Sequence, residues 1–99
     1  SYATSLIIFP DKVVEWSPPK LSDLQPESFD ADALGDLQEC DVILLGTGER
    51  MSFPPAEFRK QAKENGLHIE SMDTGAACRT YNVLMAEGRR VAAALYKIQ

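Results

Sequence analysis

The sequence has few of the residues that build metal sites and disulfide frameworks: one histidine and two cysteines among 99 residues. A single histidine, His68, cannot form a multi-histidine metal site, and Cys40 and Cys78 have neither the CxxC pattern nor zinc-ligand spacing. Two cysteines so far apart make no disulfide framework, so we expect reduced thiols, as in a cytoplasmic protein. We therefore expect no metal site.

The sequence also lacks a run of basic residues, an apolar run of membrane length and a visible signal peptide. It carries 15 acidic and 10 basic side chains, for a net charge of −5. Such a surface repels the phosphates of nucleic acids and of anionic membranes. No apolar run approaches the roughly 20 residues of a membrane helix. We therefore expect a cytoplasmic protein that binds no nucleic acid and does not insert into a membrane.

What the chain does have is enough apolar sequence for one core. It is 44% hydrophobic and 25% charged over 99 residues, which fits a single domain spanning 1–99. A chain of this size buries roughly 60–70% of its unfolded surface, so its stability margin is modest. A homodimer would widen that margin.

Hydrophobic patterning predicts an α/β domain in the order hairpin, helix, strand, helix, strand, helix, strand. Alternation of strands and helices after residue 40 is typical of right-handed βαβ units with a parallel sheet. Gly66 and Gly88 fit the stops of the second and third helices. The predicted segments are a hairpin of 6–9 and 13–16 around Pro10-Asp11-Lys12, helices 30–39, 55–65 and 74–87, and strands 42–45, 67–70 and 91–98.

Two turns follow strands of the predicted sheet, Gly46-Thr47-Gly48 and Asp73-Thr74-Gly75. Ligands of open parallel sheets gather beyond the carboxyl ends of the strands, so these turns should meet at one edge. Arg50 and the N–H groups near Gly75 could then hold a small anion. Alternatively, the glycines make tight strand-to-helix turns and Arg50 pairs with an acid. The dinucleotide and phosphate-loop fingerprints are both incomplete.

Three side chains near the predicted turns have two interpretations each. Cys78 lies near a helix start beside Arg79, which makes it a candidate reactive thiol, or else a small packing residue. Asp73 could act as a general base, but capping of the helix explains it more simply. His68 should lie on an exposed strand face, where we assign it no catalytic role.

The hairpin carries aromatic residues at its ends, Tyr2 and Trp16. An edge with aromatic side chains could recruit another chain by strand addition. The alternative is ordinary packing of Trp16 over the sheet.

Three motifs together give the chain a family resemblance: LGTGER at 45–50, DTGAACRTYN at 73–82 and EGRRVAAAL at 87–95. In this order and spacing the chain resembles a family of small domains of unknown function. Its eukaryotic members include the mitochondrial complex I assembly factor 3 and an adipogenesis-associated protein, and this chain is similar to the bacterial members. The resemblance runs from the strand at 6–9 to about Leu95. Members usually have a further N-terminal stretch, often a hairpin, which this chain lacks, as in a trimmed or short variant.

The resemblance implies a three-layer α/β fold with a mixed, mostly parallel central sheet, flanking helices and an N-terminal β-hairpin. It implies no catalytic residue, no cofactor and action through unknown protein partners. It also implies a candidate ligand cleft at the two turns. The residues of that cleft are Gly46, Thr47, Gly48, Arg50, Asp73, Thr74, Gly75, Arg79, Tyr81 and Asn82.

These observations favour a non-catalytic protein-binding or assembly module. The alternative is a small-molecule binding protein or enzyme that uses the same cleft for an anionic ligand, with Arg50, Arg79, Tyr81 and Asn82 as ligand contacts. A third, weaker hypothesis is redox sensing through Cys78.

Overall fold

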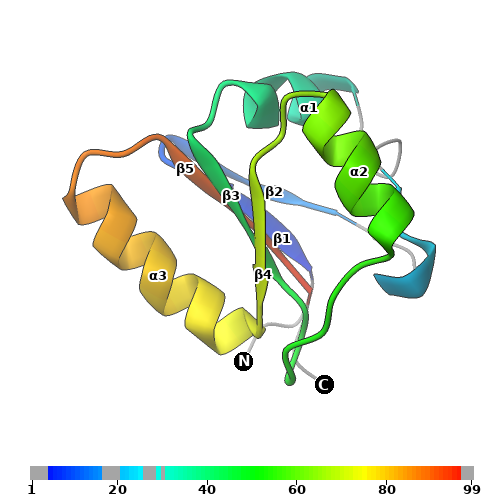
Figure 1. Cartoon of the computed structure of the whole chain (residues 1–99). Helices are drawn as coiled ribbons and strands as arrows, with labels where there is room; N and C mark the ends of the chain where they lie inside the picture. The colour runs from blue at the N-terminus through cyan, green and yellow to red at the C-terminus, as the bar shows by residue number, and fades with distance from the viewer. Residues whose placement is uncertain (1–4, 17–20, 26–28, 30, 97–99) are drawn as a thin grey trace.

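The computed structural model describes residues 5–16, 21–25, 29 and 31–96 and contains five strands and three α-helices (Figure 1). The order along the chain is the predicted one, with a short 3₁₀ helix, η1, that the sequence did not predict. The elements are β1 (Leu6–Phe9), β2 (Lys12–Glu15), η1 (Leu21–Asp23), α1 (Ala31–Gln38), β3 (Val42–Gly46), α2 (Ala56–Glu64), β4 (Ile69–Met72), α3 (Thr74–Ala86) and β5 (Val91–Leu95).

The strands form one open sheet in the order β2-β1-β5-β3-β4. β3 pairs in parallel with both β4 and β5, while β1 pairs antiparallel with β2 and β5. The sheet is therefore mixed, as the family resemblance implied, and β2 and β4 are its two edge strands.

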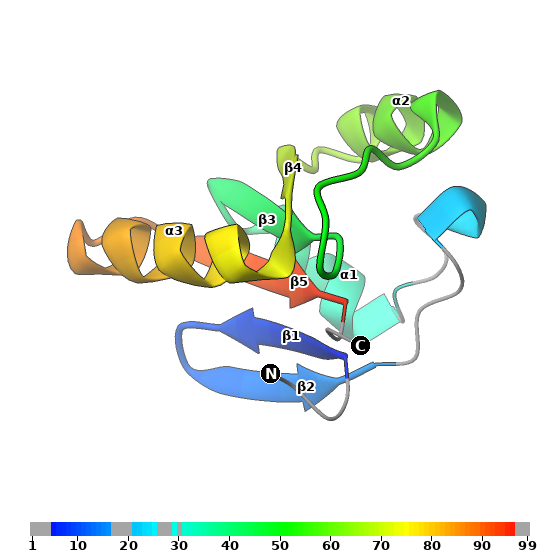
Figure 2. The same ribbon diagram turned by 90° about the horizontal axis from the view of Figure 1, so that it is seen from below.

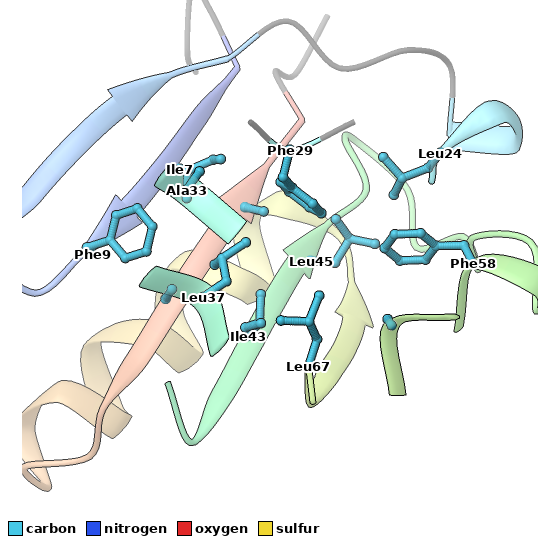
Figure 3. Close-up of a cluster of buried hydrophobic side chains, with 13 residues drawn as sticks. Ile7, Phe9, Leu24, Phe29, Ala33, Leu37, Ile43, Leu45, Phe58 and Leu67 are labelled. Carbon is cyan, nitrogen blue, oxygen red and sulfur yellow. The ribbon is translucent and has the colours of Figure 1, made fainter. Parts of the chain in front are cut away.

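Helices cover the two faces of the sheet unequally (Figure 2). α1 and α2 pack on one face, where Leu37 and Phe58 join Ile43 and Leu45 in a buried cluster (Figure 3). α3 packs alone on the other face, against a smaller cluster that contains Leu44. Continuous apolar runs such as 42–45 have this origin, since successive side chains of a doubly covered strand enter different cores.

The middle of β5 consists of three alanines, and α3 packs closely on this strand. All five of its residues, Val91 to Leu95, are buried. Ala92 and Ala94 belong to the cluster under α1 and α2, and Ala93 belongs to the cluster under α3. Small side chains at these positions leave room for the residues that cover both faces of the strand.

The helix ends follow the predicted sequence signals. Asp73 caps α3, because its Oδ1 accepts a hydrogen bond from the backbone N–H of Ala76 at 2.8 Å. Pro55 is the N-cap of α2. Gly66 and Gly88 have φ values of 78° and 76° just beyond α2 and α3, a backbone conformation that favours glycine.

One predicted strand was placed two residues too early. The sequence predicted a strand at 67–70, whereas β4 spans Ile69–Met72. Leu67 instead ends the helical segment: its backbone N–H donates to the carbonyl of Ala62 at 2.9 Å, and its side chain is buried beneath α2. Alternation of apolar residues does not distinguish an apolar residue that packs at the end of a helix from one that begins a strand.

The other boundaries differ little from prediction. The second hairpin strand is Lys12–Glu15, so Pro10 and Asp11 alone make the turn. β5 ends at Leu95, so the predicted extension of this strand is wrong at Tyr96, and its last part, 97–98, lies outside the described residues, as do Tyr2 and Asp30.

Trp16 is partly buried and packs against the core, as one of its two interpretations predicted. Its ring stacks on Phe29 with centroids 5.1 Å apart and meets Tyr96 edge-on at 5.6 Å. Its indole N–H donates to the carbonyl of Leu95 at 3.2 Å. The same packing raises the pKa of Tyr96 to about 12 through burial. Trp16 thus fastens the end of the hairpin to the end of β5.

Two phenylalanines around α2 provide a direct test of this packing. Phe58 is 1% exposed and Phe53 is 64% exposed. We expect Phe58→Ala to lower the free energy of unfolding by about 3–5 kcal/mol, because it leaves a cavity in the core. Phe53→Ala should cost less than about 1 kcal/mol, the scale of its exposed contact with a cation. Urea unfolding measures both values, and equal losses would contradict the placement of α2.

Candidate functional site

The two glycine-bearing turns meet at the carboxyl edge of the parallel strands, as predicted. Gly46 pairs with Met72 at the end of the β3–β4 ladder. Beyond it, the backbone N–H of Gly48 donates to Thr74 Oγ1 at 2.9 Å, and the N–H of Thr74 donates to the carbonyl of Gly48 at 2.8 Å. The turns are joined by direct hydrogen bonds between their own groups.

Thr74 is the centre of this junction. It is 0% exposed, and its hydroxyl both accepts from Gly48 and donates to the carbonyl of Tyr96 at 2.7 Å. One side chain therefore connects the turn after β3, the start of α3 and the end of β5. Because this buried hydroxyl both donates and accepts a hydrogen bond within the protein, its role is structural.

Gly46 is required by close approach. A Cβ atom at this position would lie 2.8 Å from Cδ2 of Leu95 and 3.0 Å from both Cα and Oγ1 of Thr74. Any larger residue would push apart the turn and the start of α3.

The first turn of α3 is already partly occupied by the chain itself. The N–H of Thr74 is bonded to Gly48 and that of Ala76 to Asp73, whose role as the helix cap is confirmed. On the other turn, the Thr47 hydroxyl donates to the carbonyl of Arg50 at 2.7 Å and accepts the N–H of Ser52 at 3.0 Å. A ligand at this edge would have few free backbone donors, and the ligand cleft stays a prediction.

The remaining residues of the predicted cleft are not all gathered at the turns. Arg79 lies beside them, because its Nη1 would be 3.5 Å from a Cβ on Gly75. Arg50 and Asn82 are exposed. Tyr81 instead packs into the cluster under α3, and its pKa is raised by burial, with smaller contributions from the charges of Cys40 and Asp11.

Neither cysteine forms a disulfide. Cys40 is half-buried, its Sγ donates to the carbonyl of Asp36 at 3.5 Å, and burial raises the pKa of its thiol. Cys78 packs against the cluster under α3, in agreement with the packing interpretation. Its reactivity stays a prediction. His68 is exposed, as predicted.

A groove that the sequence did not predict lies beside the first half of the edge strand β4, where Ile69 and Glu70 line it. It has a volume of about 760 Å³ and lies between α2 and α3, and its apolar lining includes Leu44 and Leu67. Arg59, Lys63 and Arg89 line it, although the sequence indicated no basic surface. The sequence alone does not show that β4 lies at the sheet edge, where these cations, distant in sequence, come together.

One of the carboxylates at the groove already has a partner. Asp41 accepts from the backbone N–H of Arg90 at 3.4 Å and from its Nη2 at 3.3 Å. These contacts, the backbone hydrogen bond foremost, lower the pKa of Asp41. Asp41 therefore offsets the groove cations less than an unpaired carboxylate would.

The loop between β3 and α2 exposes large apolar side chains. Met51 is 47% exposed and Phe53 is 64% exposed. The guanidinium of Arg59 lies 5.5 Å from the ring centroid of Phe53, so the same arginine borders the groove and this loop. The loop and the groove thus form one continuous surface.

Neither a membrane-spanning helix nor a metal-binding cluster occurs in the described residues. No helix there is long and apolar enough to cross a membrane. No group of three or more histidine, cysteine, aspartate or glutamate side chains in the same part of the chain is arranged to hold a metal ion.

Comparison with known proteins finds a family of unknown function and relatives that carry the name of an assembly factor. A family model described as "Protein of unknown function (DUF498/DUF598)" matches residues 1–96. The chain is similar to a zebrafish (Danio rerio) protein named NADH dehydrogenase [ubiquinone] 1 alpha subcomplex assembly factor 3, with 36% identity over 88 residues. That match covers 89% of this chain and 50% of the relative, so the chain spans about half the length of that relative.

Two bacterial relatives match over more of their length. A Francisella tularensis protein named 13 kDa major membrane protein is 33% identical over 90 residues, covering 91% of this chain and 72% of the relative. The NMR structure of a Xanthomonas campestris protein has a TM-score of 0.80 and 44% identity, covering 96% of this chain and 70% of that one. The cytoplasmic location expected from the sequence stays a prediction.

The junction at Thr74 can be tested without changing side-chain shape. Thr74→Val removes a buried hydroxyl, so the N–H of Gly48 and the carbonyl of Tyr96 each lose this hydrogen-bond partner. We expect the free energy of unfolding to fall by about 2–4 kcal/mol, since each orphaned buried group costs about 1–3 kcal/mol. The matched control is Thr80→Val, the same substitution further along α3. It should change the free energy of unfolding by less than about 0.5 kcal/mol. Urea unfolding that gives the two variants the same loss would contradict this account.

The environment of Cys40 predicts slow alkylation. In a Cys78→Ser variant, the remaining thiol should react with iodoacetamide more slowly at pH 8 in the native state than in urea, because burial raises the pKa of Cys40 and keeps it protonated. The native rate should still be rising above pH 9. Equal native and unfolded rates would refute the prediction, and Cys40→Ser reports separately on the predicted reactivity of Cys78.

Proposed function

Because this chain belongs to the DUF498/DUF598 family of proteins of unknown function, we propose its function from its surface: it is a protein-binding module that acts in assembly of a larger complex. The proposal covers the domain itself. Further activities of longer relatives are not carried over, since the chain spans only half of the zebrafish assembly factor.

The observation that carries the proposal is the exposed apolar loop after β3. Phe53 is 64% exposed and Met51 is 47% exposed, and Arg59 lies against the Phe53 ring. Aromatic residues, methionine and arginine are enriched in protein interfaces, and exposed patches of this kind mark such surfaces. A partner that covers Phe53 would remove a large apolar side chain from water.

The candidate cleft supports chemistry less well. Gly48 and Thr74 are hydrogen-bonded to each other, and the carboxylate of Asp73 accepts the N–H of Ala76 as the cap of α3. Within the described residues, no acid, base or nucleophile is held at these turns by a second side chain, as a catalytic constellation requires. A relative named as an assembly factor fits the same proposal.

A second candidate function is binding of a small anion at the turns. It is favoured by Arg79, whose guanidinium lies close to Gly75 at the start of α3. A thermal-shift series with phosphate, citrate and nucleotides tests it. Stabilisation that is lost in Arg79→Ala would favour this function, and no shift with any anion would count against it.

The proposed function can be tested by photo-crosslinking in the cells that make this protein. A benzophenone amino acid at Phe53 should trap a discrete partner protein, and the same group at Lys60, exposed on α2, should trap it much less. Phe53→Glu should remove the protein from the larger complex in size-exclusion chromatography without lowering its melting temperature by more than a few degrees.

Two results would refute the proposal. One is that the protein in cell extracts migrates only as the isolated chain at every concentration tested. The other is that crosslinks from Phe53 and Lys60 give the same weak, diffuse products.

A further inference from the structure

The free edge of β4 presents backbone groups that the fold leaves unpaired. The N–H of Ile43 donates to the carbonyl of His68 at 2.7 Å, and the N–H of Thr47 donates to that of Met72 at 2.8 Å. Backbone groups alternate in direction along a strand, so those of Ile69 and Ser71 point away from β3. No hydrogen bond from another described residue reaches them, and such an edge is a template for a further strand.

The first half of this edge, at Ile69 and Glu70, lies in a groove with a helix on each side. Figures 1 and 2 show α3 on one side of β4 and α2 on the other. The groove walls include Ala62 and Leu67 on the α2 side and Leu84 on the α3 side. An added strand would therefore find apolar contacts for side chains on both of its faces. The opposite edge strand, β2, is largely exposed and lies beside neither of these helices.

The lining of the groove carries more cations than carboxylates, although the whole chain is acidic. The net charge of the chain is −5, yet Arg59, Lys63 and Arg89 line the groove against the two carboxylates of Asp41 and Glu70. Arg59 and Lys63 belong to α2. Glu70, the carboxylate of the edge strand, pairs with Leu44 of the α3-side cluster and so points to the α3 face. A complementary strand would carry carboxylates toward α2 and apolar side chains toward α3.

We propose that the edge of β4 binds an extended segment of a partner protein in which acidic and apolar residues alternate. The segment adds a sixth strand to the sheet through the backbone groups of Ile69 and Ser71, while its carboxylates meet Arg59 and Lys63. The inference rests on the proposed protein-binding function and names the surface and the class of segment that it uses.

A second copy of this chain fits the edge less well. A two-fold dimer uses the same surface patch of both copies, so β4 of one copy would pair with β4 of the other. Each copy would bring a groove with three cations, Arg59, Lys63 and Arg89, against two carboxylates, Asp41 and Glu70, so two surfaces of the same net sign would meet. This repulsion favours a segment of a different, acidic protein.

The first test uses two capped nine-residue peptides, one of alternating glutamate and valine and one of alternating lysine and valine. Titration into the ¹⁵N-labelled protein should shift the amide signals of Ile69 and Ser71 with the glutamate peptide only. Raising the salt concentration should weaken the binding. Equal binding of the lysine peptide, no binding of the glutamate peptide, or shifts confined to β2 or to the α3 start would overturn the inference.

Matched charge variants sharpen this test. Lys63→Glu should weaken binding of the glutamate peptide by about five- to tenfold, the scale of one or two exposed ion pairs. Lys60→Glu makes the same charge change on the same helix outside the groove and should leave the affinity nearly unchanged. Equal effects of the two variants would mean that only overall charge matters, which would contradict the inference.

A backbone variant separates this inference from the proposed function. Ser71→Pro removes an N–H that points away from β3, and proline is tolerated on an edge strand when its N–H side faces outward. The amide spectrum and melting temperature first verify that the variant is folded. The variant should lose the partner complex that Phe53 crosslinks.

If the complex persists in folded Ser71→Pro, the edge inference fails while the protein-binding function stands. If neither the parent protein nor the variant forms a complex, both the edge inference and the proposed protein-binding function fail. Concentration-dependent self-association that Ser71→Pro abolishes would replace the partner segment by a second copy and would also overturn the inference.

Discussion

The arrangement depends on the buried hydroxyl of Thr74. It bonds to Gly48 and Tyr96, which belong to segments following two different strands. Gly46 makes this contact feasible because no Cβ fits there. The strand edge where ligands of related architectures commonly bind is thereby fastened by the chain's own groups. The groups that the fold leaves unpaired lie elsewhere, along β4.

The main features of the fold followed from local signals. The apolar run at 42–45 predicted a doubly covered strand, and Asp73, Gly66 and Gly88 marked helix ends that the structure confirms. The meeting of the two turns also followed, because parallel neighbouring strands end at one edge. The misplaced boundary at Leu67 shows the limit: burial against α2, a tertiary contact, decides where the helix unit ends and the strand begins.

The surface features could not be predicted in the same way. Which strand lies at the edge depends on the hairpin pairing with β5, a contact between the two ends of the described chain. That pairing leaves β4 free and brings Arg59 and Arg89, distant in sequence, to one groove. Sequence patterns identified the glycine-rich turns because their residues are unusual. They gave no sign of the groove, whose residues are ordinary and matter only through their placement.

Binding is therefore assigned to the edge of β4 and to the apolar loop around Phe53. The two glycine-bearing turns have a structural role. Hydrogen–deuterium exchange of the protein, free and in the complex isolated from cells, tests this claim most directly. The account predicts that the complex slows exchange at the amides of Ile69 and Ser71 and in the loop around Phe53, with little change at Gly48 and Thr74. Protection confined to the two turns, with unchanged exchange along β4, would contradict it.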